Sequence, residues 1–308
     1  MQHGRSSFDA RFGVLAPENF DVPELFRRTF DSLYQHGLMN LLYLADAKNG
    51  ESYEATVDRT LMAIYDNLIG YQADQTGYDK MWGDSDEEKF RNHLIDHAKQ
   101  SGVPSWEHDG FLFGRNKAGA FPQPPEGGIY FPVDIEHVHH LWDTFASLTS
   151  GEYKSVPLTW KVDTDSERYR TGDPVLLYFK PEHSEAVYNL VLQIYRSHSK
   201  WFRNISPLFG AKLKTPSGRE MGGISFAQSC NASGHSFNRE IGTVLTLPAR
   251  GIRLRLALGD VTSYPDVIRT TAYALWMNGI LLEHPAFRGS EGLNAFRHIA
   301  LHSDQWTG

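Results

Sequence analysis

Cysteine is almost missing from this sequence of 308 residues, which contains only Cys230. A single cysteine excludes an internal disulfide and any metal site built from several thiolates, and it is typical of a reducing compartment. The amino terminus lacks the apolar segment of a signal peptide, and no run approaches the roughly 18 apolar residues of a membrane span. We therefore expect a cytoplasmic protein without a membrane partner.

Positive charge is also in short supply. Lysine and arginine together number 30, against 37 aspartate and glutamate residues, which gives a formal net charge of -7. Binding to nucleic acid depends on a basic surface that contacts phosphates, so this balance argues against a nucleic-acid partner. Neither a Gly-x-x-x-x-Gly-Lys-Ser/Thr run nor a Gly-x-Gly-x-x-Gly run is present, so the sequence does not support nucleotide binding.

The histidines form no recognisable metal-binding pattern. His137 and His140 are three residues apart, but no third ligand accompanies them. Cys230 is followed five residues later by His235, and this pair alone does not predict a catalytic thiol. We therefore predict no metal ion and no organic cofactor.

The sequence does contain a mixture of helical and strand-like patterns. Its hydrophobic residues make up 41%, and 27 glycines and 15 prolines supply turns, which is typical of a globular protein with helices and strands. Apolar residues recur at steps of three and four, which predicts helices, in residues 22–47, 52–70, 86–100, 137–148, 185–198, 261–282 and 295–302. Short apolar runs at 156–162 and 174–179 predict strands.

Residues 101–132 are rich in glycine and proline and lack periodicity. Such a stretch is typical of a long surface connection or of irregular hairpins, and we place a domain boundary there. We predict an α+β fold in which a mainly helical amino-terminal region, residues 1–128, packs on a mixed α/β carboxyl-terminal domain, residues 129–308.

Residues 207–239 collect the groups that a binding site for an anion needs. The segment holds the amines of Lys212 and Lys214, the imidazole of His235, the guanidinium of Arg239 and several hydroxyls. These groups suit a phosphorylated or otherwise anionic substrate.

Two neighbouring features bear on the same site. Gly222-Gly223 enters a strand-like run, which predicts a β-bulge or a close approach of two backbone segments. Arg170 and Arg239 each adjoin apolar, strand-like sequence that would hold the guanidinium in place.

A series of short motifs follows in a fixed order along the second half of the chain. The motifs are Tyr169-Arg170 with Asp173, Val175-Leu176-Leu177-Tyr178, Pro207-Leu208-Phe209, Leu213, Gly222 to Ala227, and Ser236-Phe237 with Arg239. This series resembles the HopA effector-like family, which includes a type III secretion effector of plant pathogens and the lyase component of class V lanthipeptide and thioviridamide-like biosynthesis. The resemblance covers roughly residues 130–285, but Gly210 and Gln228 stand where the family often has a threonine and an acidic residue.

The resemblance implies a phosphoserine/phosphothreonine lyase that acts on a ribosomally made peptide. Elimination of phosphate yields dehydroalanine or dehydrobutyrine, and it requires a base for the α-proton, cations for the oxygens and an acid for the leaving group. Lys212 or Lys214 is then the predicted base, and His235 is the predicted acid. The predicted phosphate ligands are Arg170, Tyr178, Ser236 and Arg239.

The implied partners are a phosphorylated precursor peptide and a kinase partner protein. Two other functions stay open at this point, because one fold can serve several roles. The chain is then either a non-catalytic, effector-like protein-binding module, or a scaffold that delivers the peptide to a separate kinase.

Overall fold

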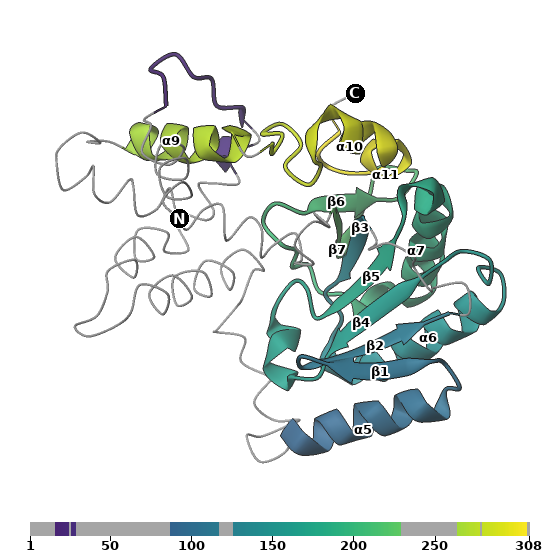
Figure 1. Cartoon of the computed structure of the whole chain (residues 1–308). Helices are drawn as coiled ribbons and strands as arrows, with labels where there is room; N and C mark the ends of the chain where they lie inside the picture. Colours follow the sequence, from purple (N-terminus) through teal and green to yellow (C-terminus); the bar gives the residue numbers. More distant parts are fainter. Residues whose placement is uncertain are drawn as a thin grey trace, which may run out of the picture.

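A computed structural model describes residues 16–24, 26–28, 87–116, 126–228, 264–277 and 279–306. Within these residues, helices surround a seven-stranded sheet of order β1-β2-β4-β5-β3-β7-β6 (Figure 1). All neighbouring strands are antiparallel. The chain is therefore an α+β protein, as its sequence predicted.

The strands are β1 (Ser105–His108), β2 (Phe111–Arg115), β3 (Gly127–Phe131), β4 (Thr159–Asp163), β5 (Val175–Phe179), β6 (Ala211–Lys214) and β7 (Glu220–Gln228). The helices are α5 (Glu87–Gln100), α6 (Val138–Ser150), α7 (Ser184–His198), α9 (Tyr264–Met277), α10 (Gly289–Ala295) and α11 (Arg297–Leu301). Short 3-10 helices lie at Ile135–His137, Ser166–Arg170, Pro181–His183 and Ser199–Trp201. No helix in this described part of the chain is long and apolar enough to cross a membrane.

The predicted elements that fall on described residues are confirmed within a few residues. The helices predicted at 86–100, 137–148, 185–198, 261–282 and 295–302 correspond to α5, α6, α7, α9 and α11, and the two predicted strands correspond to β4 and β5. The helix predicted at 52–70, and most of that at 22–47, lie outside the described residues.

The glycine- and proline-rich stretch 101–132 contains the β1–β2 hairpin and β3. The predicted boundary between residues 128 and 129 falls inside β3, and β2 before it pairs with β4 after it. The sheet therefore continues across this position, because backbone hydrogen bonds join strands from both sides of it.

The sheet has one face covered by helices. Trp160 of β4 contacts Trp142 and Phe145 of α6, with ring centroids 5.6 and 5.5 Å apart. Phe131 of β3 lies 5.4 Å from Phe145 and extends the same cluster. Figure 1 shows α6 and α7 against this side of the sheet, with α10 and α11 near β6 and α5 beside β1. Large buried aromatic rings thus fix the sheet against its helices.

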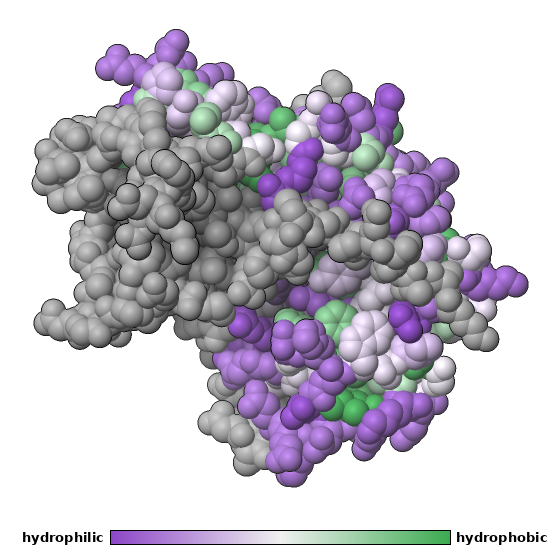
Figure 2. Space-filling view, viewed as in Figure 1, coloured by the Kyte–Doolittle hydropathy of each residue, from purple (hydrophilic) through white to green (hydrophobic). Residues whose placement is uncertain are grey.

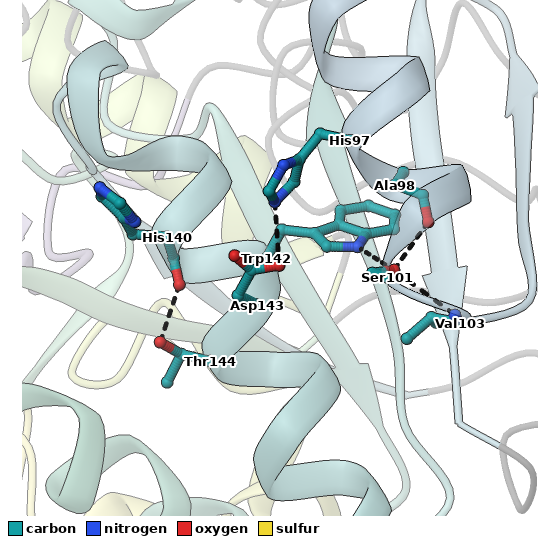
Figure 3. Close-up of polar contacts among 8 residues, drawn as sticks. All are labelled: His97, Ala98, Ser101, Val103, His140, Trp142, Asp143 and Thr144. Atoms are coloured by element: carbon teal, nitrogen blue, oxygen red, sulfur yellow. Dashed lines mark hydrogen bonds and ion pairs between the residues drawn. The ribbon is translucent and has the colours of Figure 1, made fainter.

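A small set of polar contacts fastens α5 to α6 (Figure 3). The indole Nε1 of Trp142 donates to Ser101 Oγ at 3.0 Å, and Ser101 Oγ donates to the carbonyl of Ala98 at 2.7 Å. The imidazole Nε2 of His97 lies 2.9 Å from Asp143 Oδ1. The end of α5 is therefore held to the first two turns of α6 by hydrogen bonds and by burial.

A histidine cluster lies where α5, α6 and the 3-10 helix Ser199–Trp201 meet. The rings of His97 and His139 are 5.7 Å apart, and those of His139 and His140 are 4.1 Å apart. Burial lowers the pKa of His139, and the neighbouring imidazoles lower it further. The cluster comprises His93, His97, His137, His139, His140 and His198, around the indole of Trp201.

A buried carboxyl group ends strand β4. Asp163 is 7% exposed and accepts a hydrogen bond from the backbone N–H of Asp165 at 3.0 Å. Burial raises the pKa of Asp163 to about 7, while that hydrogen bond and the charge of Lys161 oppose the rise. The unfolded chain therefore ionises this carboxyl at a lower pH than the folded protein does.

Asp163 should make the protein less stable as the pH rises. Its folded pKa lies above its unfolded one, so its stabilising contribution is complete below about pH 4 and is lost as the pH rises through about 7. We expect Asp163→Asn to remove this loss, so that the variant gains up to about 4 kcal/mol over the wild type by pH 8. Urea unfolding between pH 4 and 8 measures the difference, and parallel curves for the two proteins would contradict this explanation.

Candidate functional site

Both predicted lysines lie on the edge strand β6. Along this strand Ala211 and Leu213 are buried, while Lys212 and Lys214 are half-buried, as the alternation of a strand requires. The two amines therefore leave the strand on the side away from its buried residues. Lys212 Nζ lies 3.9 Å from the carboxylate of Glu220, the first residue of β7.

An irregularity in β7 brings Glu220 to this position. Lys212 pairs with Ser225 but Lys214 pairs with Glu220, so Met221 to Ile224 bulge out opposite Leu213. Gly222 has a φ of +61°, and a Cβ on Gly223 would collide with the carbonyl oxygen of Ile205. The bulge and the close backbone approach predicted for Gly222-Gly223 are both confirmed, and only glycine fits there.

The carboxyl-terminal residues hold the other edge of β6. Lys214 N–H donates to the carbonyl of His302 at 2.7 Å, and Asp304 N–H donates to the carbonyl of Lys212 at 2.9 Å. The Asp304 carboxylate accepts from Lys212 N–H at 2.8 Å. Tyr188 of α7 donates its hydroxyl to the carbonyl of Lys214 at 2.7 Å. The backbone that carries the two lysines is thus fixed from three directions.

Asp304 is a half-buried ionisable group beside the lysines. Burial raises its pKa, and the hydrogen bond from Lys212 and the charges of Lys212 and Lys214 work against that rise. The carboxylate of Glu220 raises the pKa further. Two amines, a half-buried carboxyl and a surface carboxylate therefore share this strand edge, and together they can stabilise an anion and move a proton.

An imidazole pair closes the same edge. His302 stacks on Tyr188 with ring centroids 4.3 Å apart, and His298 lies 5.1 Å from His302. Burial lowers the pKa of His302, and the charge of His298 lowers it further. Both rings pack against α7, so they support β6 rather than contact its lysine side chains in the described geometry.

The structure places the other predicted residues at different points of the fold. Tyr178 is half-buried on β5 and lies on the same face of the sheet as Lys212. The pairings across β7 and β3 place Lys212 in register with Leu176, and Tyr178 follows Leu176 by two residues, so both point to one face. Three strand spacings of about 4.8 Å, or roughly 14 Å, separate β5 from β6. Arg170 ends the 3-10 helix before β5, with its guanidinium 3.5 Å from Glu167. His235, Ser236 and Arg239 lie outside the described residues.

Glu220, Asp304 and His302 are the members of this site that sequence reasoning missed. Asp304 lies 92 residues from Lys212, and no motif connects the two positions. The available signal for a further segment beside β6 was its short length, because a short edge strand needs a partner for its outer backbone N–H and C=O groups. In the described part of the chain, no three His, Cys, Asp or Glu side chains are arranged to hold a metal ion.

Residues 105–244 match the model of the HopA1 effector protein family, and this range runs from β1 past the end of β7. This matched part of the chain is HopA1 effector-like. The matched range contains Lys212, Lys214 and Glu220, whereas Asp304 and His302 of the HopA1-like chain follow it. A search of curated proteins found no match.

Two solved structures share the fold of this HopA1-like chain. The effector protein from Pseudomonas syringae pv. tomato strain DC3000 is 16% identical, with a TM-score of 0.51, over 87% of this chain and 100% of the other. The effector protein from Pseudomonas syringae pv. syringae strain 61 is 17% identical, with a TM-score of 0.52, over 85% of this chain and 98% of the other. At these identities the likeness establishes the fold alone.

The side chain of Asp304 should stabilise β6 through its hydrogen bond to Lys212 N–H. Asp304→Ala leaves that buried donor without its acceptor, which costs roughly 1–3 kcal/mol of unfolding free energy. Asp304→Asn keeps an acceptor oxygen in the same place and should lose much less. Urea unfolding of both variants measures the contrast, and equal losses would show that the hydrogen bond is not the stabilising contact.

Proposed function

We propose that this HopA1-like chain is a phosphoserine/phosphothreonine lyase that acts on a ribosomally made peptide in lanthipeptide-type biosynthesis. The observation that carries the proposal is the pair of lysines on β6, held beside the half-buried carboxyl of Asp304. The family resemblance supplies the reaction, and the strand edge supplies groups of the required chemistry.

The reaction removes a proton and a phosphate from neighbouring carbons. A base takes the α-proton, the electron pair forms the carbon–carbon double bond, and the bond between the β-carbon and the phosphate oxygen breaks. The departing phosphate takes up a proton from an acid. A cation near the peptide carbonyl stabilises the negative charge that develops there as the α-proton leaves.

The surroundings of the two lysines suggest different roles. Lys212 lies 3.9 Å from Glu220, so its ammonium is balanced by a carboxylate and suits the role of a fixed cation. Lys214 forms no side-chain ion pair with any described residue, so its amine is the better candidate for the base. Asp304, in contact with the Lys212 backbone, is positioned to take up or return a proton at this edge.

The remaining assignments rest on the resemblance. Arg170, Tyr178, Ser236 and Arg239 stay predicted phosphate ligands, and His235 stays the predicted acid. The partners that go with this function are a phosphorylated precursor peptide and a kinase that makes it.

A protein-binding module is the second candidate function, and an aromatic surface favours it. Trp106 of β1 is 40% exposed, stacks on Phe113 of β2 at 5.3 Å, and lies under the guanidinium of Arg115 at 5.5 Å. Figure 2 shows hydrophobic areas among hydrophilic surface in this region of the molecule. Exposed aromatic side chains next to arginine are typical of interfaces, and such a surface would serve an effector-like protein without any elimination.

Replacement of Lys214 should separate the two functions. We expect Lys214→Ala to slow the release of phosphate from a phosphothreonine peptide by roughly 10²–10⁴-fold, as the loss of a general base does. Lys214→Arg should be equally slow, because a guanidinium keeps the charge but does not accept a proton at neutral pH. Mass spectrometry of the peptide measures the loss of phosphoric acid.

The matched control is Lys154→Ala, which removes an exposed lysine after α6 and should leave the rate unchanged. Full activity of Lys214→Arg would make Lys214 a cation rather than the base. A wild-type chain that binds the phosphopeptide without eliminating phosphate would have the second candidate function instead.

A further inference from the structure

An open pocket of about 440 Å³ lies between the turn of the β6–β7 hairpin and the carboxyl-terminal end of α7. The turn supplies hydroxyl groups from Thr215 and Ser217, and Ser199 supplies another from the helix side. The pocket is lined by Tyr195, Arg196, Ser199, Thr215, Pro216, Ser217 and Arg219.

The charge of this pocket is unusual for the chain. Its lining contains two guanidinium groups and no carboxylate, although the whole sequence has a formal net charge of -7. Neither Arg196 nor Arg219 forms a side-chain ion pair with another described residue. Two guanidinium groups without carboxylate partners, together with hydroxyl donors, are the chemistry that binds a phosphate group.

A larger hollow among the described residues is lined mainly by negative charge. It measures about 770 Å³ and lies between the start of α5 and the end of β4. Its lining carries six carboxylates against two arginines, Arg91 and Arg168. This hollow would repel a phosphate, so the two cavities differ in the charge of the ligand that they can accept.

The pocket adjoins the strand that carries the proposed base. The α-carbon that loses its proton is bonded to the β-carbon that carries the phosphate, so the base and the phosphate ligands must lie close together. Thr215, which lines the pocket, directly follows Lys214, and their Cα atoms are about 3.8 Å apart. Arg170 instead ends the 3-10 helix before β5, beside Glu167, and β5 lies three strands from β6.

We infer that this pocket binds the phosphate group of a phosphorylated serine or threonine side chain, through Arg196 and Arg219. The inference rests on the proposed function for the identity of the ligand, and it assigns the phosphate subsite of that function. The hydroxyls of Ser199 and Ser217 complete the donors around the oxygens.

If Arg196 only stabilised its helix, its replacement would lower stability without a selective loss of phosphate binding. Arg196 lies in the last turn of α7, where a positive charge stabilises the negative end of the helix. An arginine with that role alone contributes to stability and not to recognition of a phosphate. Arg219, in the hairpin turn, is outside any helix and has no such role.

The test uses the full chain and two matched peptides. One peptide carries a phosphonate in place of phosphothreonine, with a methylene group replacing the bridging oxygen, so that it cannot be eliminated; the other carries threonine. We expect Arg219→Ala and Arg196→Ala each to weaken phosphonate-peptide binding about tenfold or more, as the loss of a charged hydrogen bond does. Binding of the threonine peptide should stay unchanged, and Arg297→Ala at the exposed start of α11 is the control. Fluorescence anisotropy measures both affinities.

Two outcomes overturn the inference. Equal weakening for both peptides would give the arginines a structural role, and wild-type affinity in both variants would place the phosphate elsewhere, with Arg170→Lys as the next variant. Turnover of the phosphothreonine peptide is measured in parallel. If the wild type eliminates phosphate and Arg219→Ala does so at the same rate, the lyase proposal stands and this pocket is not its phosphate subsite. If the two arginines bind the phosphonate peptide selectively but the wild type eliminates no phosphate, the pocket stands as a phosphate site and the lyase proposal fails.

Discussion

The positions of Lys212 and Lys214 depend on the backbone hydrogen bonds around β6. This strand is four residues long, and it pairs with β7 on one side and with residues 302–304 on the other. A strand this short at the edge of a sheet is held weakly by its single neighbour, so the second set of hydrogen bonds is what fixes it. Because the chain that provides this second set follows β6 by about ninety residues, the edge forms only when the whole fold is complete.

The described surface has one region rich in negative charge and another rich in positive charge. Carboxylates gather between α5 and β4, whereas lysine and arginine side chains gather around the β6–β7 hairpin. An overall negative charge does not prevent local binding of an anion, because solvent and salt screen charges beyond roughly 10 Å. A peptide with a phosphate at one point and basic residues at another would meet a favourable charge at both ends.

Local patterns in the sequence predicted most of the described helices and the two strands β4 and β5, because periodicity reports directly which face of an element is buried. α7 and β5 are examples, and the glycine pair of β7 was recognised as a bulge from its composition alone. The pairing of β1 and β2 with the rest of the sheet was not predicted, since strand partners far apart in sequence leave no local signal. Lys212 and Lys214 were predicted because they lie in one short segment of sequence. Asp304 was not predicted, because its role depends on a hydrogen bond to a residue that is distant in sequence.

The histidine cluster at α5 and α6 opposes the protonation of its own member His139. Burial lowers the pKa of His139, and the charges of His140, His97 and His93 lower it further, because their rings lie 4.1 to 6.1 Å from its ring. Asp143 and Glu136 neutralise part of the added charge. At acidic pH the protonation of His139 therefore costs stability on this side of the fold, while the lysine-bearing edge at β6 is held by contacts that do not involve these rings.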